Sequence, residues 1–296
     1  MDATAGLEIG VAIPHTGAHA SPELVRQWCT TADDAGFGVL WGVDHVVMPR
    51  EVRSRYPLPR QPAAIAKDAI SELLSPNFEL VTTMAFAAAV TRRIRIGSAI
   101  EVLTIRNAVL NARQLATVDR YSGGRVVCGV GAGWLKEEAE AMGMPWDRRG
   151  VRTDEHIALL RALWTADGKH VEFRGQFWDI APMDPEPRPV QQPIPIIVGG
   201  HSDAAIDRAV RLGDGWIAAN MSPQRLAEFL PRVRAAALRH SREPSSLKIY
   251  CVSRGARTLA EVRAYQKLGV YSLQVGIETL DELNRFADEV LPQLVS

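Results

Sequence analysis

The sequence lacks an excess of either charge. Its 296 residues include 34 Lys and Arg against 34 Asp and Glu, which gives a net charge of zero with neutral histidines. Proteins that bind nucleic acid neutralise phosphates with a basic surface. The charge balance therefore argues against a nucleic-acid partner.

Cysteine is scarce and follows no functional spacing. The three cysteines, Cys29, Cys128 and Cys251, lie far apart and form no CxxC pair. An odd number at such distances argues against a disulfide framework and against a structural zinc site. The pattern is typical of a protein from a reducing compartment.

Long apolar runs are missing as well. No run approaches the ~20 residues that a membrane-spanning helix needs. Residues 1–7 lack the basic stretch and apolar run of a secretory signal. The sequence therefore predicts a cytoplasmic protein without a membrane partner.

What the sequence does contain is an alternation of short β-branched runs with amphipathic segments, which predicts a parallel sheet covered by helices. The predicted strands are 8–13, 38–42, 94–100, 126–130, 194–198, 214–219, 247–252 and 271–276. Eight strands with no break in composition favour a closed barrel, and such a barrel takes roughly 250 residues as one unit. We therefore expect an α/β fold, a (β/α)8 TIM barrel, with residues 1–296 as a single domain.

Helix start and stop signals agree with this pattern. Ser21 and Pro22 predict the beginning of a helix that ends at Gly36. A second helix is expected over 106–121, and Ser202 is expected to cap the helix after strand five.

Two connections are too long for plain barrel loops. They are the insertions after strand two, residues 43–75, and after strand four, residues 131–193. The second should contain two helices and a hairpin at 170–180. Long ordered loops often carry function, and barrel active sites lie at the C-terminal ends of the strands, so we expect the active site there.

Asp44 and His45 follow strand two. They could bind a metal, act as an acid/base pair or form a buried structural pair. A catalytic metal needs several converging ligands, but His15, His45 and His201 are the histidines near predicted strand ends. The sequence therefore predicts no metal site. It leaves His45 as a general acid/base or ring-stacking residue positioned by Asp44, with the structural pair as the alternative.

The turn after strand five reads Gly199-Gly200-His201-Ser202. Two glycines let a ligand approach the backbone, and the helix that begins at Ser202 offers N–H groups and a dipole that favour an anion. This turn is therefore a candidate phosphate site. The alternative is a tight turn with a serine cap.

Gly129, Gly131 and Gly133 lie after strand four and precede Trp134. Their spacing is G-x-G-x-G, unlike the G-x-G-x-x-G of a dinucleotide-binding fold, and they follow the wrong strand. We interpret the glycines as room for a flat ring system, with close helix–strand packing as the alternative. Trp134 is expected to line the ligand pocket.

Several segments together resemble the bacterial luciferase-like oxidoreductase superfamily, and within it the actinobacterial branch that uses coenzyme F-420. The segments are WGVDHV (41–46), RNAVLNARQLATVDRYSGGRVVCGVGAGW (106–134), EEAEAMGMPWDRRGVRTDEHIALLRALW (137–164), FRGQFW (173–178) and PIPIIVGGHSDAAIDRAVRLGDGW (193–216). They cover roughly two-thirds of the chain in the expected order.

The resemblance implies a barrel with the cofactor ring deep at the strand ends. It places a non-prolyl cis peptide bond at Ala99–Ile100 behind the ring, Asp44 near the ring edge and His45 near the reactive carbon. It places a cofactor phosphate at the Gly199–Ser202 turn. Two residues depart from the family pattern. Ala108 stands where proline is expected, and Trp134 stands where sugar-phosphate dehydrogenases of the superfamily carry a glutamate, which argues against sugar-phosphate oxidation.

The resemblance also implies hydride transfer between coenzyme F-420 and a small-molecule substrate. An FMN-dependent monooxygenase supplied by a separate reductase is the alternative, and a barrel without cofactor that has a binding role is a further one. An NAD(P)-dependent Rossmann enzyme rests only on the glycines after strand four. A homodimer is a family expectation.

Overall fold

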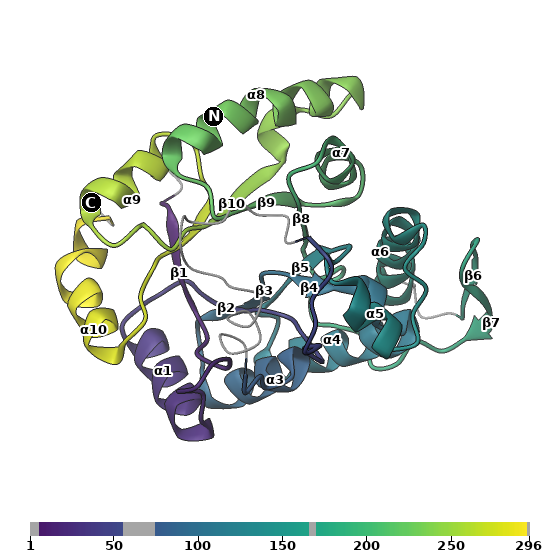
Figure 1. Cartoon of the computed structure of the whole chain (residues 1–296), viewed down its shortest axis with the longest axis horizontal. Helices are drawn as coiled ribbons and strands as arrows, with labels where there is room; N and C mark the ends of the chain where they lie inside the picture. The colour runs from purple at the N-terminus through teal and green to yellow at the C-terminus, as the bar shows by residue number, and fades with distance from the viewer. Residues whose placement is uncertain (1–5, 56–74, 166–169, 295–296) are drawn as a thin grey trace.

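A computed structural model of the chain describes residues 6–55, 75–165 and 170–294. Eight parallel strands of these residues close into a barrel, in the order β1-β2-β3-β5-β8-β9-β10-β11 (Figure 1). Pairing of β1 with β11, in register Glu8↔Ser272, closes the ring. The strands are β1 Glu8–Ala12, β2 Val39–Gly42, β3 Arg95–Ser98, β5 Val126–Gly131, β8 Ile196–Gly199, β9 Gly215–Ala219, β10 Lys248–Val252 and β11 Ser272–Gln274. The predicted barrel and its eight strands are confirmed.

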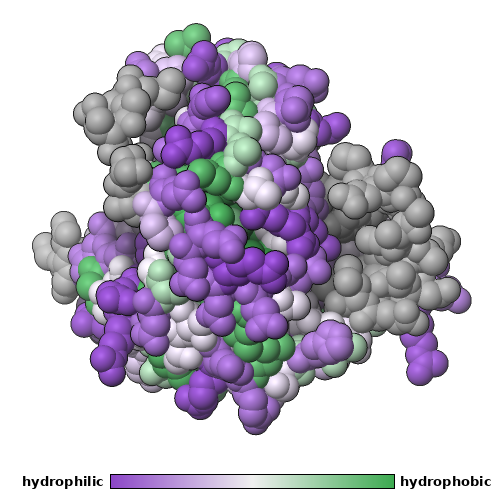
Figure 2. Space-filling view, turned by 90° about the vertical axis from the view of Figure 1, so that its left-hand side faces the viewer, coloured by the Kyte–Doolittle hydropathy of each residue, from purple (hydrophilic) through white to green (hydrophobic). Residues whose placement is uncertain are grey.

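Helices surround the barrel (Figure 1). They are α1 Pro22–Asp34, α3 Leu80–Val90, α4 Ala108–Ser122, α5 Lys136–Ala141, α6 Arg149–Thr165, α7 Asp203–Leu212, α8 Pro223–Arg239, α9 Leu259–Gln266 and α10 Leu280–Glu289, with short 3-10 turns η1 Leu103–Ile105, η2 Pro244–Ser246 and η3 Leu291–Gln293. None of the described helices is long and apolar enough to cross a membrane. On the side of α1 and α10, hydrophilic residues cover most of the surface, with apolar residues between them (Figure 2).

The predicted caps form where the sequence places them. The hydroxyl of Ser21 accepts a hydrogen bond from the Leu24 N–H at the start of α1. Ser202 does the same for the Ala205 N–H at the start of α7. The helix expected from residue 106 begins two residues later, because Asn107 accepts from the Leu110 N–H and caps α4.

The barrel interior is filled by side chains. Buried residues from β2, β5, β8, β9 and β10 form this cluster, namely Val39, Trp41, Val127, Ile197, Ile217 and Tyr250. The indole of Trp41 occupies the space that a side chain at position 97 would need, because a Cβ on Gly97 would lie 2.3 Å from the ring. The barrel is a packed core, so a ligand can enter only at its C-terminal edge, hereafter the barrel mouth.

The end of β3 departs from regular strand geometry. The Ala99–Ile100 peptide bond is cis, at the expected position. Beyond it a short strand, β4 (Glu101–Val102), pairs with β5. The Ser98 hydroxyl donates to the Gly129 carbonyl at 2.8 Å and accepts from the Gly129 N–H at 2.9 Å. These two hydrogen bonds fix β3 against β5 just before the chain turns into the barrel mouth.

The insertion after β5 contains the two predicted helices, α5 and α6, and the predicted hairpin. Its strands, β6 (Val171–Arg174) and β7 (Asp179–Met183), are antiparallel and project away from the barrel (Figure 1). Glu155 of α6 accepts hydrogen bonds from three backbone N–H groups of the hairpin turn, which attaches the hairpin to the barrel. Of the predicted insertion after β2, residues 56–74 lie outside the described residues.

The contact between Gly129 and Ser98 yields a stability prediction. A Cβ at position 129 would lie 1.9 Å from the Ser98 carbonyl oxygen, a backbone atom that cannot move alone. Gly129→Ala should therefore lower the free energy of unfolding by about 2 kcal/mol or more, as overpacking in a core does. Urea unfolding followed by tryptophan fluorescence measures the effect. Gly6→Ala is the control, since nothing lies within 4 Å of its Cβ position, and an equal effect of both substitutions would refute the packing argument.

Candidate active site

The predicted site residues come from different strand ends and meet at the barrel mouth. His45 follows β2, Ile100 lies between β3 and β4, Trp134 follows β5, and the Gly199–Ser202 turn follows β8. The rings of His45 and Trp134 contact each other edge to face, with centroids 5.9 Å apart. A Cβ on Gly199 would lie 2.8 Å from the Ile100 side chain, so the β3 and β8 ends are also in contact.

His45 is oriented by a glutamate that the sequence interpretation did not include. Its Nδ1 lies 2.9 Å from Oε2 of Glu138 on α5. The other oxygen, Oε1, accepts the backbone N–H groups of Val46 at 2.6 Å and Val47 at 3.3 Å. The side chains of His45 and Glu138 are 11% and 2% exposed, so this contact lies within the protein with one edge of the ring reaching solvent.

Asp44 does not position His45, which corrects the sequence interpretation. Its carboxylate is buried and turns the other way, accepting from the Val102 N–H at 2.7 Å and from the Arg106 guanidinium at 2.6 Å. The reason is that the Arg106 guanidinium and the Val102 N–H satisfy this carboxylate, while Glu138 is the partner of His45. Asp44 instead ties the end of β2 to the segment that follows the cis peptide.

Arg106 lies between several carboxylates. Besides Asp44, it contacts Glu101 at 2.8 Å and Glu79 at 3.3 Å. Glu101 is fully buried, and burial raises the pKa of its carboxyl to about 7, against the opposing effect of Arg106. One guanidinium cannot neutralise three buried or half-buried carboxylates, and burial raises the pKa of Asp44 as well as that of Glu101.

The network continues into α4 and α6. Asn111 donates to Glu101 Oε1 at 2.7 Å, and its carbonyl oxygen lies 3.1 Å from Nε2 of His156. Burial lowers the pKa of His156 to about 3, so this imidazole is neutral at physiological pH. Since the Asn111 oxygen can only accept, the neutral ring carries its proton on Nε2.

The glycines after β5 make room for the protein's own chain. A Cβ on Gly131 would lie 2.0 Å from the Ile100 side chain, and one on Gly133 would lie 2.7 Å from Val102. The space beside Gly131 therefore accommodates Ile100, which stands at the barrel mouth in place of the open volume that the sequence interpretation assigned to a ring. Any contact of a ring with this side of the barrel would be made through Ile100.

The Gly199–Ser202 turn has the local structure of an anion site. Gly200 adopts φ +122°, which a side chain rarely allows, and its carbonyl accepts from the Trp216 indole at 2.8 Å. The His201 imidazole turns away to accept the Ala219 N–H at 3.2 Å. Burial, together with Arg225 and Arg232, lowers the pKa of His201 to about 4. Arg232 is paired with the carboxylate of Asp203 in the first turn of α7, at 2.7 Å. Arg225 has no ion pair among the described residues, so its charge adds to the helix dipole at the start of α7.

The network residues Glu138, Arg106 and Glu101 were missed because little in the sequence marks them. Glu138 lies in the charged run EEAEA, which has the pattern of a solvated helix face. No cluster of three or more His, Cys, Asp or Glu placed to hold a metal ion occurs among the described residues.

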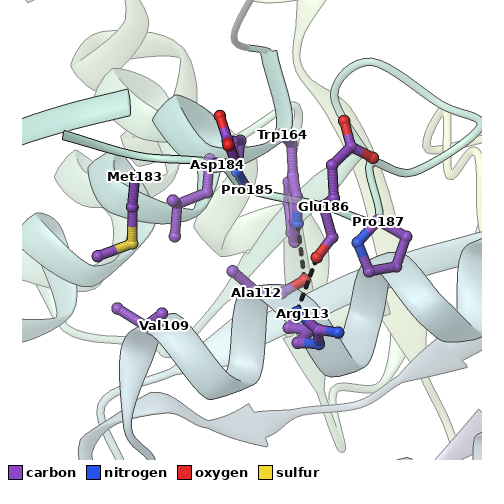
Figure 3. Close-up of a pocket in the computed structure, with 10 residues that line it drawn as sticks. Val109, Ala112, Arg113, Trp164, Met183, Asp184, Pro185, Glu186 and Pro187 are labelled. Carbon is purple, nitrogen blue, oxygen red and sulfur yellow. Dashed lines mark hydrogen bonds between the residues drawn. The ribbon is translucent and has the colours of Figure 1, made fainter. Parts of the chain in front are cut away.

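A separate cavity of about 150 Å³ lies on the outer wall between α4, α6 and the segment after β7 (Figure 3). Met183, Pro185 and Pro187 line one side, and Arg113 closes it with a hydrogen bond to the Glu186 carbonyl. None of the predicted site residues lines it, so it is distinct from the barrel mouth.

A family model described as luciferase-like monooxygenase matches residues 7–265. The chain belongs to this luciferase-like family. The resemblance to the superfamily is thereby confirmed, and the protein is a luciferase-like oxidoreductase.

Individual relatives use different cofactors. The chain is 34% identical over 247 residues to an uncharacterised protein of Mycobacterium tuberculosis (strain ATCC 25618 / H37Rv), covering 83% of this chain and 82% of that protein. It is 38% identical over 132 residues to the FMNH(2)-dependent dimethylsulfone monooxygenase of Pseudomonas putida, covering 43% and 36%. The coenzyme F-420 dependent tetrahydromethanopterin reductase of Methanopyrus kandleri has the same fold, with a TM-score of 0.74 and 16% identity over 98% of this chain and 100% of that one.

The raised pKa of Glu101 predicts a pH dependence of stability. Its pKa is about 7 in the folded protein against an ordinary 4.5, so the folded state holds this proton more tightly than the unfolded chain. The stability it contributes is complete below pH 4.5 and is lost as the pH rises to about 7. Glu101→Gln removes the titration. The free energy of unfolding of the wild type minus that of the variant should therefore fall over this interval.

Urea unfolding across that pH interval measures the difference. Glu51→Gln, at an exposed glutamate, is the matched control and should leave the slope unchanged. A difference between wild type and Glu101→Gln that stays flat with pH would show that Glu101 does not titrate in this range.

Proposed function

We propose that this luciferase-like enzyme transfers a hydride between coenzyme F-420 and an organic substrate at the barrel mouth. The observation that carries the proposal is the pairing of a positive helix start at the Gly199–Ser202 turn with a partly exposed, oriented imidazole at His45. A ring cofactor with an anionic side chain needs both an anion site and a proton-handling group.

The residues fit such a cofactor. The Gly199-Gly200 backbone forms a cradle that a side chain would fill, because a Cβ on Gly200 would lie 2.6 Å from Ala205. The first-turn N–H groups of α7 that have no partner within the helix face the same region. Arg225 has no ion pair among the described residues and contributes to the positive potential there. These groups would hold the phosphate of the cofactor.

The protein's own residues supply orientation and a proton. A bound deazaflavin supplies two-electron hydride chemistry. Ile100 and Trp134 would bracket the ring region from the β3 and β5 ends. His45 would hold or accept one proton at the substrate. Asp44 and Arg106 would keep the β2 and β3 ends in register, which fixes the distance between these groups.

A second candidate is a monooxygenase that uses reduced FMN from a separate reductase. It is supported by the similarity to the FMNH(2)-dependent enzyme of Pseudomonas putida. We favour coenzyme F-420 because the segments WGVDHV and PIPIIVGGHS resemble that branch of the superfamily. With either cofactor we infer a homodimer that works in the cytoplasm. A barrel that has lost its cofactor and keeps a binding role is the remaining alternative.

Cofactor titration tests the proposal. Purified protein stripped of cofactor is titrated with F-420 and separately with FMN, each oxidised and reduced, while tryptophan fluorescence is followed. Quenching by F-420 at micromolar concentration with little response to FMN is expected. A preference for reduced FMN would replace the proposal with the monooxygenase, and binding of neither would leave the cofactor-free alternative.

The anion site is tested by one substitution on α8. Arg225→Met keeps the length of the side chain but removes the charge, and should weaken binding of the preferred cofactor about tenfold, which corresponds to ~1.4 kcal/mol. Arg234→Met on the same helix is the control, because Arg234 is exposed and has no ion pair among the described residues. Equal affinity of both variants and the wild type would place the phosphate elsewhere.

A further inference from the structure

We propose that Glu138 is a positioning residue that fixes the proton of the neutral His45 ring on Nδ1 and leaves the Nε2 lone pair at the barrel mouth. The catalytic use of that lone pair rests on the proposed function. The state of the ring itself rests on the contacts of α5 and can be tested without any cofactor.

The hydrogen bonds of the Glu138 carboxylate determine which oxygen faces the imidazole. Glu138 Oε1 already accepts the N–H groups of Val46 and Val47, so Oε2 is the oxygen that faces His45 Nδ1, at 2.9 Å. An ionised carboxylate has acceptors only. The proton between Oε2 and Nδ1 therefore belongs to the imidazole, and a neutral His45 has no proton left for Nε2.

The His45 ring cannot easily turn to exchange its two nitrogens. The peptide group that follows His45 is held at both its polar atoms, because Glu138 accepts the Val46 N–H and the Asn77 side-chain amide donates to the His45 carbonyl. The rings of His45 and Trp134 also pack edge to face, at an interplanar angle of 83°. Rotation would break the charge-assisted hydrogen bond and leave Oε2 unpaired in a region where Glu138 is 2% exposed.

The consequence concerns the direction of proton transfer. None of the described residues bonds to His45 Nε2, and the 11% of the side chain that is exposed leaves it reachable. A bound coenzyme would supply the hydride chemistry. In substrate oxidation Nε2 would accept the proton that the substrate heteroatom releases, and in substrate reduction it would return that proton. The negative charge of Glu138 stabilises the intervening imidazolium, as a carboxylate behind a catalytic histidine does.

The neighbouring residue provides a matched control. Glu137 on the same helix accepts from the N–H groups of Arg53 and Ser54, at 2.6 and 2.9 Å, and from the Ser54 hydroxyl. It therefore holds the same insertion to α5 without touching His45. Substitutions at 137 and at 138 both remove contacts between α5 and the loop after β2. A substitution at 138 also removes the contact to the His45 imidazole, whereas one at 137 does not.

The test is a long-range ¹H–¹⁵N NMR spectrum of the histidine side chains above neutral pH, without cofactor, with His45 assigned from a His45→Gln spectrum. In the wild type we expect the proton on Nδ1. In Glu138→Gln the amide oxygen must still accept Val46 and Val47, so the amide nitrogen faces Nδ1 and donates to it. The His45 proton should then move to Nε2. Glu137→Gln should give the wild-type spectrum.

Three results would overturn the inference. They are a wild-type ring protonated on Nε2, an unchanged His45 signal in Glu138→Gln, and the same change in Glu137→Gln. Thermal unfolding of Glu138→Gln and Glu137→Gln checks that each is folded. If Glu138→Gln alone loses stability, Glu138→Asp is added, which retains the carboxylate and should restore the proton on Nδ1.

The titration with F-420 separates this inference from the proposed function. Glu138→Gln should bind F-420 within about twofold of the wild type, because the phosphate site at α7 is untouched. If the wild type binds no F-420 but its His45 is protonated on Nδ1, the proposed cofactor is wrong and the positioning role of Glu138 stands. If F-420 binds and the ring is protonated on Nε2, the positioning role is wrong and the cofactor proposal stands.

Discussion

Arg106 and two of the three carboxylates it contacts lie where water is almost absent, since its own side chain is 10% exposed and those of Asp44 and Glu101 are not exposed. Removing one member of such a group leaves an uncompensated charge in the interior, which costs several kcal/mol. The three residues come from the β2 end, β4 and the loop before α4. The attraction of Arg106 to both carboxylates therefore holds together the segments on either side of the cis peptide, and the positions of Ile100 and His45 depend on it.

At the barrel mouth, the neighbouring residues Asp44 and His45 have different partners and different roles. Asp44 points into the wall and is used for structure, while His45 points to the mouth and is available for chemistry. The β8 end shows the same division. The His201 side chain turns to the Ala219 N–H, so this imidazole is likewise used for structure. At the β2 and β8 ends, Asp44 and His201 thus hold the chain in place.

Sequence patterns were sufficient for the fold because each strand and cap is encoded locally. The β-branched runs, Ser21 with Pro22, and Ser202 all act within a few residues, and the structure follows them. The side-chain partners at the mouth were not accessible in this way. Glu138 is 93 residues from His45, and its surroundings in sequence are those of an exposed helix. The role of Gly131 was also misjudged, because the sequence shows that space is needed but not that Ile100 fills it.

The adjacent glutamates of α5 have a consequence for engineering this barrel. Glu138 accepts hydrogen bonds from the backbone at Val46 and Val47, and Glu137 accepts them at Arg53 and Ser54. A single short helix therefore fixes both ends of the intervening stretch. The loop after β2 and the helix after β5 are therefore one module, although more than eighty residues separate them in the chain. Replacing the loop after β2 with that of another enzyme would therefore require replacing α5 as well, because the new loop would otherwise lack its hydrogen-bond partners.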